Sequence, residues 1–267
     1  MAAPTPLAGF AARARSGEPL FIGWCGSPDP FAAEALVRGG FEAVLLDMQH
    51  GLPDFAAATR GIAHLAALGA PALVRVPVGD FATASRLLDT GAAGIVAPMV
   101  NSPAEAAAFV RFCKFPPVGE RSWGPGRALS YSGLDRDYFK RANALQLAIA
   151  MVETRRALDA LDGILATPGL DGVLIGPSDL SIGLTDGETV DAAHPSVDAA
   201  LTRVADACRR HGKIASVFCH TGQRAGELAA RGFDICSVAT DAMLIQAGSR
   251  RELEAARQAR DAHTTSR

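Results

Sequence analysis

Ile149-Ala-Met-Val-Glu-Thr154 and Val173-Leu-Ile-Gly-Pro-Ser-Asp-Leu-Ser181 are two apolar runs of this chain, and each reads as a β-strand that ends in a carboxylate. A helical pattern at about residues 155–166 separates them, so the two strands are expected to be parallel neighbours in one sheet. Glu153 and Asp179 would then emerge at the same end of the sheet and could share one divalent cation. The pattern therefore predicts a metal-dependent enzyme.

The alternation of strand and helix continues in both directions from these runs. Strands are expected at Leu20–Cys25, Phe41–Asp47, Leu73–Val76, Gly94–Val100, 146–152, 172–176, Ile214–Cys219 and Phe233–Val238. Helices are expected at Pro30–Val37, Asp54–Leu68, Phe81–Leu88, Pro103–Cys113, 155–166, 196–211, Gly222–Ala230 and Met243–Ala262, and a polar segment at 115–138 interrupts the rhythm.

About eight such units in 267 residues predict a (β/α)8 TIM barrel, with residues 1–267 as a single domain. The alternative is an open doubly wound sheet. The sequence has neither G-x-G-x-x-G after its first strand nor a G-x-x-x-x-G-K-[ST] phosphate loop, so the barrel is favoured.

Composition restricts the partners and the compartment. The net charge of −2 gives no reason to expect nucleic acid or an anionic membrane as a partner. The amino terminus lacks the pattern of a signal peptide, and no apolar run reaches the roughly 20 residues that span a bilayer. Five widely spaced cysteines match neither a disulfide framework nor a zinc pattern. We therefore expect a cytoplasmic protein without a membrane segment.

In a TIM barrel the chemistry lies at the carboxyl ends of the strands, and polar residues collect at those positions here. Besides the two acids, they are Asp47, His50, Arg75, Ser178, His220 and Asp241. This set offers a base, a fixed cation and two carboxylates at one rim, which favours an active site.

Structural roles are the alternative for each of these residues. Glu153 or Asp179 alone could cap a helix, and Arg75 could be the ion-pair partner of Asp47 or Asp80. His50 could simply end a loop, although Asp47, three residues before it, could reach the imidazole and fix its tautomer.

The candidate metal ligands and the positions of the lysines indicate which kind of mechanism to expect. Oxygen ligands without a supporting cysteine favour Mg²⁺ or Mn²⁺ over structural zinc. The turn at Gly176-Pro177-Ser178 could aim backbone N–H groups at a substrate carboxylate. Lys114, Lys140 and Lys213 are the only lysines, and none follows an expected strand, which argues against a Schiff-base mechanism.

Five motifs in the correct order resemble those of the class II pyruvate aldolases of the HpcH/HpaI aldolase/citrate lyase family, which act on 4-hydroxy-2-oxo acids. They are Leu46-Asp-Met-Gln-His-Gly51, Val74-Arg-Val-Pro77, Ala97-Pro-Met-Val100, Val152-Glu-Thr-Arg155 and Gly176-Pro-Ser-Asp-Leu-Ser181. The resemblance covers nearly the whole chain.

The resemblance implies roles for particular residues. Glu153 and Asp179 would bind a divalent metal cation, Mg²⁺, Mn²⁺ or Co²⁺, and the backbone of Ser178 would hold the pyruvate carboxylate. His50 would be the acid/base and Arg75 would stabilise the enolate. Asp89 would support the histidine or the aldehyde pocket, from its own or a neighbouring subunit. The family is typically a homo-hexamer, a trimer of dimers that exchange their C-terminal helices.

Three positions depart from the family pattern. Gln49 replaces a glutamate beside the base, and Met151 replaces a glutamine that touches the substrate. Residues 119–128 form a longer variant of a G-x-R-G loop, which we expect over the site.

Trp24, Trp123 and His220 are candidates for lining the aldehyde pocket.

We therefore expect reversible, metal-dependent cleavage of a 4-hydroxy-2-oxo acid to pyruvate and an aldehyde, both small molecules. Two alternatives remain. One is a CoA-ester lyase of the citrate lyase/malyl-CoA lyase branch, although the sequence offers no obvious basic site for the nucleotide tail. The other is a barrel that binds a keto acid without turning it over.

Overall fold

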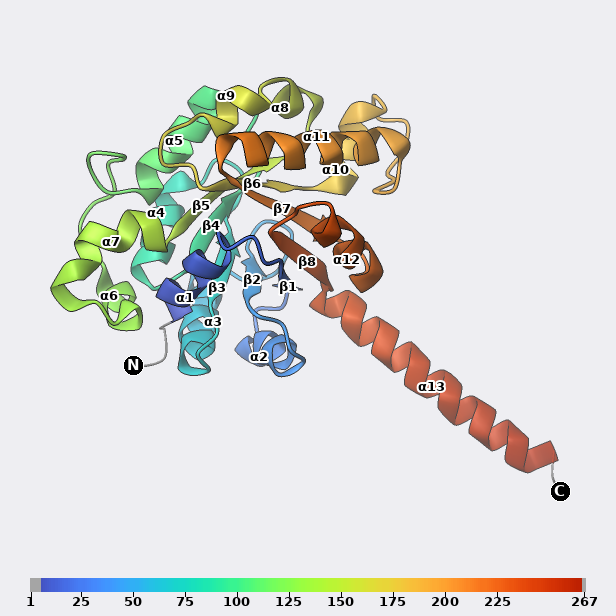
Figure 1. Ribbon diagram of the computed structural model, residues 1–267. Coiled ribbons are helices and arrows are strands. Elements are labelled where there is room, and N and C mark those ends of the chain that lie inside the picture. Colours follow the sequence, from blue (N-terminus) through green and yellow to red (C-terminus); the bar gives the residue numbers. More distant parts are fainter. Residues whose placement is uncertain (1–5, 266–267) are drawn as a thin grey trace.

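Eight parallel strands form a closed barrel in the order β1-β2-β3-β4-β5-β6-β7-β8, in a computed structural model that describes residues 6–265. The strands are β1 (Leu20–Cys25), β2 (Val44–Asp47), β3 (Ala72–Arg75), β4 (Gly94–Ala97), β5 (Leu147–Val152), β6 (Gly172–Ile175), β7 (Ile214–Cys219) and β8 (Ile235–Thr240). Helices surround the barrel (Figure 1). The predicted (β/α)8 architecture is confirmed.

The helices follow the predicted order, with additions. They are α1 (Pro6–Arg13), α2 (Pro30–Arg38), α3 (Phe55–Ala67), α4 (Phe81–Asp89), α5 (Pro103–Cys113), α6 (Gly126–Ser132), η1 (Asp135–Asp137), α7 (Tyr138–Leu145), α8 (Arg155–Asp159), α9 (Leu161–Leu165), α10 (Pro177–Leu184), α11 (Pro195–His211), α12 (Gly222–Ala230) and α13 (Asp241–Thr265). We did not predict α1, α6, α7 or α10, and the single helix expected at 155–166 is two short ones.

Some strands are shorter than predicted. The fourth ends at Ala97 instead of Val100, because the chain turns sharply at Met99, whose φ is +55°. The second begins at Val44 instead of Phe41. The last strand, in contrast, ends two residues later than expected, at Thr240. Its pairing register with β1 shifts just before this end, and there Ala239 has a φ of +52°. The differences in the fourth and eighth strands both lie at the carboxyl ends of those strands.

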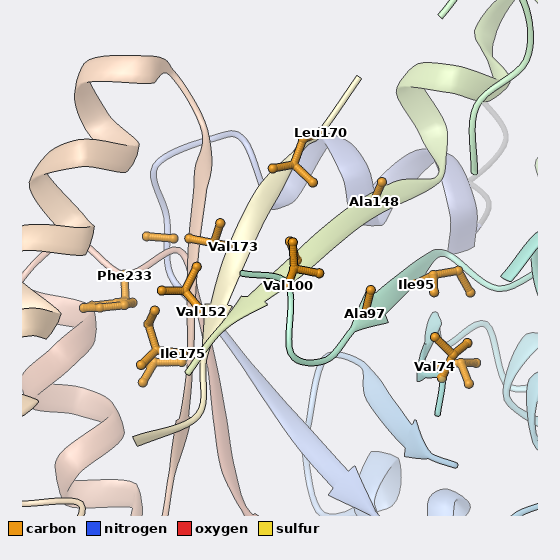
Figure 2. Packing of buried hydrophobic residues seen from close by; sticks show 14 of the residues in the cluster. Val74, Ile95, Ala97, Val100, Ala148, Val152, Leu170, Val173, Ile175 and Phe233 are labelled. Atoms are coloured by element: carbon orange, nitrogen blue, oxygen red, sulfur yellow. The ribbon is translucent and has the colours of Figure 1, made fainter. Parts of the chain in front are cut away.

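Two apolar clusters stabilise the barrel. The inner cluster fills it with side chains such as Ile22, Leu45, Ile149 and Leu174, together with Leu7 from α1. The outer cluster lies between strands and helices, and Figure 2 shows part of it around Val100, Val152, Val173 and Ile175. Alternating strand residues supply the two clusters, as expected for a barrel strand that is buried on both sides.

The amino ends of the strands are closed by a buried ion-pair network. The ammonium group of Lys114 donates to the carbonyl oxygens of Asn143 and Gln146 (both 2.7 Å) and to Oδ2 of Asp171 (2.6 Å). Arg15, just after α1, donates to Oδ1 of Asp171 (2.7 Å). This network ties four segments together at the end of the barrel opposite to the carboxyl ends of the strands.

The last helix leaves the body of the molecule. Helix α13 begins directly after β8 and extends away from the barrel (Figure 1). Most of its described side chains are exposed. None of the helices described in residues 6–265 is both long and apolar enough to cross a membrane.

Candidate active site

A cavity of about 650 Å³ opens at the carboxyl ends of the strands. Eight predicted site residues line it: Trp24, Asp47, His50, Arg75, Met151, Gly176, Ser178 and Asp179. The remaining lining comes mainly from the segment after β1, the loop after β2 and the start of α13. The fold therefore brings together residues that lie far apart in the sequence.

A buried ion pair forms part of the cavity. Asp47 and Arg75 are register partners at the ends of β2 and β3, and the guanidinium donates to the carboxylate through Nε–Oδ1 (2.8 Å) and Nη2–Oδ2 (2.5 Å). Nε1 of Trp24 adds a third bond to Oδ2 at 3.1 Å, and the guanidinium lies 4.7 Å from the Trp24 ring centre. Because these contacts restrain it on several sides, Arg75 is a preorganised cation.

The pKa of Asp47 reflects this environment. Burial by itself would raise it, but the hydrogen bonds and the charge of Arg75, together with Trp24 and the N–H of Gln49, hold it below the usual value for an aspartate. Asp47 therefore stays ionised. Of the two acids considered as alternative ion-pair partners of Arg75, Asp47 is the one that the structure pairs with it.

Glu153 lies behind the cavity wall, and its Oε1 accepts a hydrogen bond of 2.7 Å from the backbone N–H of Met99. The positive φ of Met99 aims this N–H, a role that the sequence did not reveal. A Cβ at Gly176 would lie 2.7 Å from the other oxygen, Oε2, so only glycine leaves room for the carboxylate there. Burial raises the pKa of Glu153, the Met99 N–H opposes this, and the charge of Asp179 raises it further.

Asp179 lies in the first turn of α10, which begins with Pro177 directly after β6. The first N–H groups of a helix have no partner within the helix, and here they belong to Ser178 and Asp179 at the cavity. The helix dipole also favours negative charge at this end. The predicted anion-binding turn at Gly176-Pro177-Ser178 thus has a helix N-terminus behind it.

His50 is exposed at the cavity, on the loop that follows β2. We expected Asp47 to hold its imidazole, but the structure shows a different contact. Oδ1 of Asp47 accepts from the backbone N–H groups of Gln49 (3.0 Å) and His50 (3.3 Å). Both carboxylate oxygens also bind Arg75. Asp47 therefore shapes the loop that carries His50 and does not fix the ring.

Several predicted residues lie elsewhere. Asp89 ends α4, at the amino ends of the strands, where its Oδ1 accepts from Nη2 of Arg121 (2.6 Å). The loop at 119–128 lies at the same end, because Nη1 of Arg121 donates to Oε1 of Gln146 (2.8 Å), directly before β5. We expected this loop over the site, but in this chain it lies at the other end of the barrel. The loop follows a helix, and helix-to-strand connections lie at the amino ends of the strands.

The predicted aromatic lining is partly right. Trp24 lines the cavity. Trp123 instead borders a second cavity, with Leu129, Leu134 and Phe139. His220 is not among the lining residues, but its ring packs edge-on against Phe218, which is one of them.

Sequence reasoning noted Asp241 but gave it no role. This buried residue follows β8, and its carboxylate accepts from the backbone N–H groups of Gly26 (3.0 Å) and Ser27 (2.9 Å). It therefore fastens the segment after β1 to the start of α13. The unusual backbone at Ala239, two residues earlier, would have been difficult to predict from an alanine.

The chain is similar to known proteins over most of its length. The family model described as HpcH/HpaI aldolase/citrate lyase matches residues 21–247. A hydroxypyruvate/pyruvate aldolase of Rhizorhabdus wittichii is 38% identical over 90% of this chain and 95% of its own. A 4-hydroxy-2-oxovalerate aldolase of Novosphingobium aromaticivorans is 35% identical over 75% of this chain and 77% of its own.

Solved structures share the fold. An HpcH/HpaI aldolase/citrate lyase family protein of Burkholderia cenocepacia superposes with a TM-score of 0.85 and 32% identity, covering 93% of this chain and 99% of that one. The citrate lyase beta subunit of Mycobacterium tuberculosis, in complex with oxaloacetate and magnesium, shares only the fold: TM-score 0.55, 19% identity, and coverage of 86% and 95%.

Proposed function

Because this chain belongs to the HpcH/HpaI aldolase/citrate lyase family, whose curated relatives here are carbon–carbon lyases, we propose that it cleaves a 4-hydroxy-2-oxo acid reversibly to pyruvate and an aldehyde. The intermediate would be the enolate of pyruvate. The observation that carries the proposal is the ion pair of Arg75 with Asp47, held in a cavity that also offers Asp179 and, behind Gly176, Glu153.

A divalent cation fits the residues present. Glu153 and Asp179 are two oxygen donors close enough for the charge of one to raise the pKa of the other, and a bound cation would relieve that repulsion. A distant fold neighbour was solved with magnesium. Mg²⁺, Mn²⁺ and Co²⁺ all suit such donors. When bound, the ion would supply Lewis-acid polarisation of the keto group.

Arg75 would stabilise the charge that collects on the enolate oxygen when the bond between C3 and C4 breaks. Its guanidinium is already held by Asp47 and Trp24, so it would need no reorganisation during the reaction. A donor aimed at developing charge in this way commonly contributes about 10²-fold or more to turnover.

Substrate binding would use the carboxyl ends of β5 and β6. The N–H groups at the start of α10, at Ser178 and Asp179, would donate hydrogen bonds to the pyruvate carboxylate next to Gly176. Met151, whose Sδ lies 3.9 Å from Nη1 of Arg75, would pack against the keto acid. Trp24 would cover the other side of Arg75.

His50 would take the proton of the C4 hydroxyl during cleavage and return it during synthesis. Asp89 lies at the opposite end of the barrel in this chain, so it would support His50 only from a second copy. We therefore propose a homo-oligomer, a hexamer built as a trimer of dimers, in which α13 is exchanged between subunits.

The cavity gives little support to a CoA-ester lyase. Arg75 is the only arginine or lysine among its described lining residues, and it is bound to Asp47. A CoA tail carries phosphates, which would need additional cations near the mouth.

The test is release of pyruvate from a 4-hydroxy-2-oxo acid, measured in untreated protein, after EDTA, and after Mn²⁺ is returned. We expect loss with EDTA and recovery with Mn²⁺. Cleavage that is unaffected by thorough removal of metal would overturn the proposed mechanism, and absence of cleavage in every condition would overturn the proposed activity.

A further inference from the structure

The active-site cavity has two chemically different ends. At one end lie Arg75, Met151 and the start of α10, which the proposed function assigns to the keto acid. The other end is built by the segment after β1, by Leu52 of the loop after β2 and by the first turns of α13. In the closed barrel β1 is paired with β8, on the side opposite to β4 and β5. The two ends therefore face each other across the mouth.

Four apolar side chains lie at the second end. Pro28, Leu52, Ala242 and Ile245 line the cavity there. Leu52 is 79% exposed and Ile245 is 64% exposed, although both border a cavity. Apolar surface of this kind gains free energy when a ligand covers it and releases its water.

The only charged side chain at this end, among the described lining residues, is an acid. Asp241 is buried, and its carboxylate already accepts from the N–H groups of Gly26, Ser27 and Ala242. It is therefore not free to bind a cationic ligand. Its negative charge would repel a carboxylate or a phosphate held nearby.

We propose that this end binds the aldehyde and that it selects aldehydes with an uncharged, apolar chain over those that carry a carboxylate or a phosphate. The selection rests on the proposed function, because it needs a keto-acid enolate at the other end. In the direction of synthesis, C3 of the enolate forms a bond to the aldehyde carbon, and the resulting alkoxide takes a proton. The aldehyde chain then lies along Pro28, Leu52 and Ile245.

The first experiment compares acceptors of equal shape and different charge. With pyruvate and Mn²⁺, kcat/KM is measured for 4-methylpentanal and for 4-oxobutanoate, in which a carboxylate replaces the branched end. We expect about tenfold or more in favour of the neutral aldehyde, the scale of one unscreened like-charge contact. In a series of linear aldehydes, each added methylene should raise kcat/KM by up to about fourfold until the chain passes Ile245.

A second measurement separates this inference from the function on which it rests. Exchange of the C3 protons of pyruvate with D₂O, followed by NMR, reports enolate formation without any aldehyde. If the pyruvate protons exchange but kcat/KM for 4-oxobutanoate equals or exceeds that for 4-methylpentanal, only the proposed aldehyde selection is overturned. No exchange in the presence of Mn²⁺ overturns both.

Matched variants locate the selection. Ile245→Arg adds a cation to the apolar end, and it should shift the ratio of kcat/KM toward 4-oxobutanoate by about tenfold while pyruvate exchange is retained. Gln246→Arg adds the same charge to an exposed neighbour that does not line the cavity, and it should leave the ratio unchanged. Equal shifts in the two variants, or none in Ile245→Arg, would contradict the proposal.

Discussion

Nε and Nη2 of Arg75 lie 2.8 Å and 2.5 Å from the two carboxylate oxygens of Asp47, in a pair that joins the ends of β2 and β3. Both side chains are buried, so the pair has strong mutual attraction and little competition from water. The same carboxylate also holds the N–H groups of Gln49 and His50. One acid thus sets the positions of the proposed electrostatic catalyst and of the loop that carries the proposed base.

Asp47→Asn should lower kcat by about 10²-fold, because Arg75 would lose one charged partner and its fixed orientation. The fold should persist, since an amide fills the same volume. Asp80→Asn is the matched control: Asp80 caps α4 through the N–H of Thr83, and asparagine caps helices as well as aspartate does. Similar kcat values for the two variants would contradict the role given to Asp47.

The lowered pKa of Asp47 also predicts a pH dependence of stability. A carboxyl group with a depressed pKa in the folded state stabilises the protein above its unfolded pKa of roughly 4, and the contribution is lost as pH falls through the folded pKa. Urea unfolding should therefore show the largest difference between wild type and Asp47→Asn at neutral pH. The difference should shrink in acid. A gap that stays constant down to strongly acidic pH would be inconsistent with this pairing.

Glu153→Gln should raise the melting temperature of the metal-free protein at neutral pH. Burial, and to a smaller extent Asp179, raises the pKa of Glu153, so the unfavourable charge appears as pH rises through the folded pKa, and stability falls there. Glutamine can still accept from Met99. Mn²⁺ should raise the melting temperature of wild type far more than that of the variant.

The exposed Glu188→Gln is the control for this substitution, and its melting temperature should match wild type with and without Mn²⁺. An equal Mn²⁺ response in Glu153→Gln and wild type would remove Glu153 from the proposed metal site.

Lys114→Met should lower the free energy of unfolding by about 3–5 kcal/mol, because it leaves Asp171 and two carbonyl oxygens without their buried cation. Lys140→Met removes an ammonium group that is 77% exposed, and should cost less than about 1 kcal/mol. Equilibrium unfolding in urea measures both. Equal losses of unfolding free energy in the two variants would show that the Lys114 network does not stabilise the barrel.

Asp89→Asn and His50→Ala are each expected to be almost inactive if the two residues act across a subunit interface. Subunits of the two variants, mixed and reassembled, should then recover part of the activity, because some sites would combine an intact His50 with an intact Asp89. Mixed protein that is no more active than its components would place the two residues in separate roles.

The sequence predicted most of the barrel because each strand is a short apolar run followed by an amphipathic helix. Their order alone placed Arg75, Glu153 and Asp179 at carboxyl ends. The motif resemblance, by contrast, gave a wrong position for Trp123 and for the loop at 119–128, because it assigned them to the site although they follow a helix. Applying the topology to that loop would have placed it at the amino ends of the strands.

Other features could not be predicted because they depend on backbone conformation. Met99 and Ala239 take positive φ values that their side chains do not favour. The first aims an N–H at Glu153, and the second precedes Asp241. Similarly, Asp47 has several hydrogen-bond acceptor sites, and only the structure shows that Arg75 and two backbone N–H groups use them.

The most direct test of the central claim is the exchange of pyruvate C3 protons with D₂O, because it isolates the proposed enolate. Wild-type protein with Mn²⁺ should exchange these protons, EDTA should stop the exchange, and Arg75→Ala with Mn²⁺ should be slower by about 10²-fold or more. Exchange that continues in EDTA, or that is undiminished in Arg75→Ala, would contradict a metal- and arginine-stabilised pyruvate enolate.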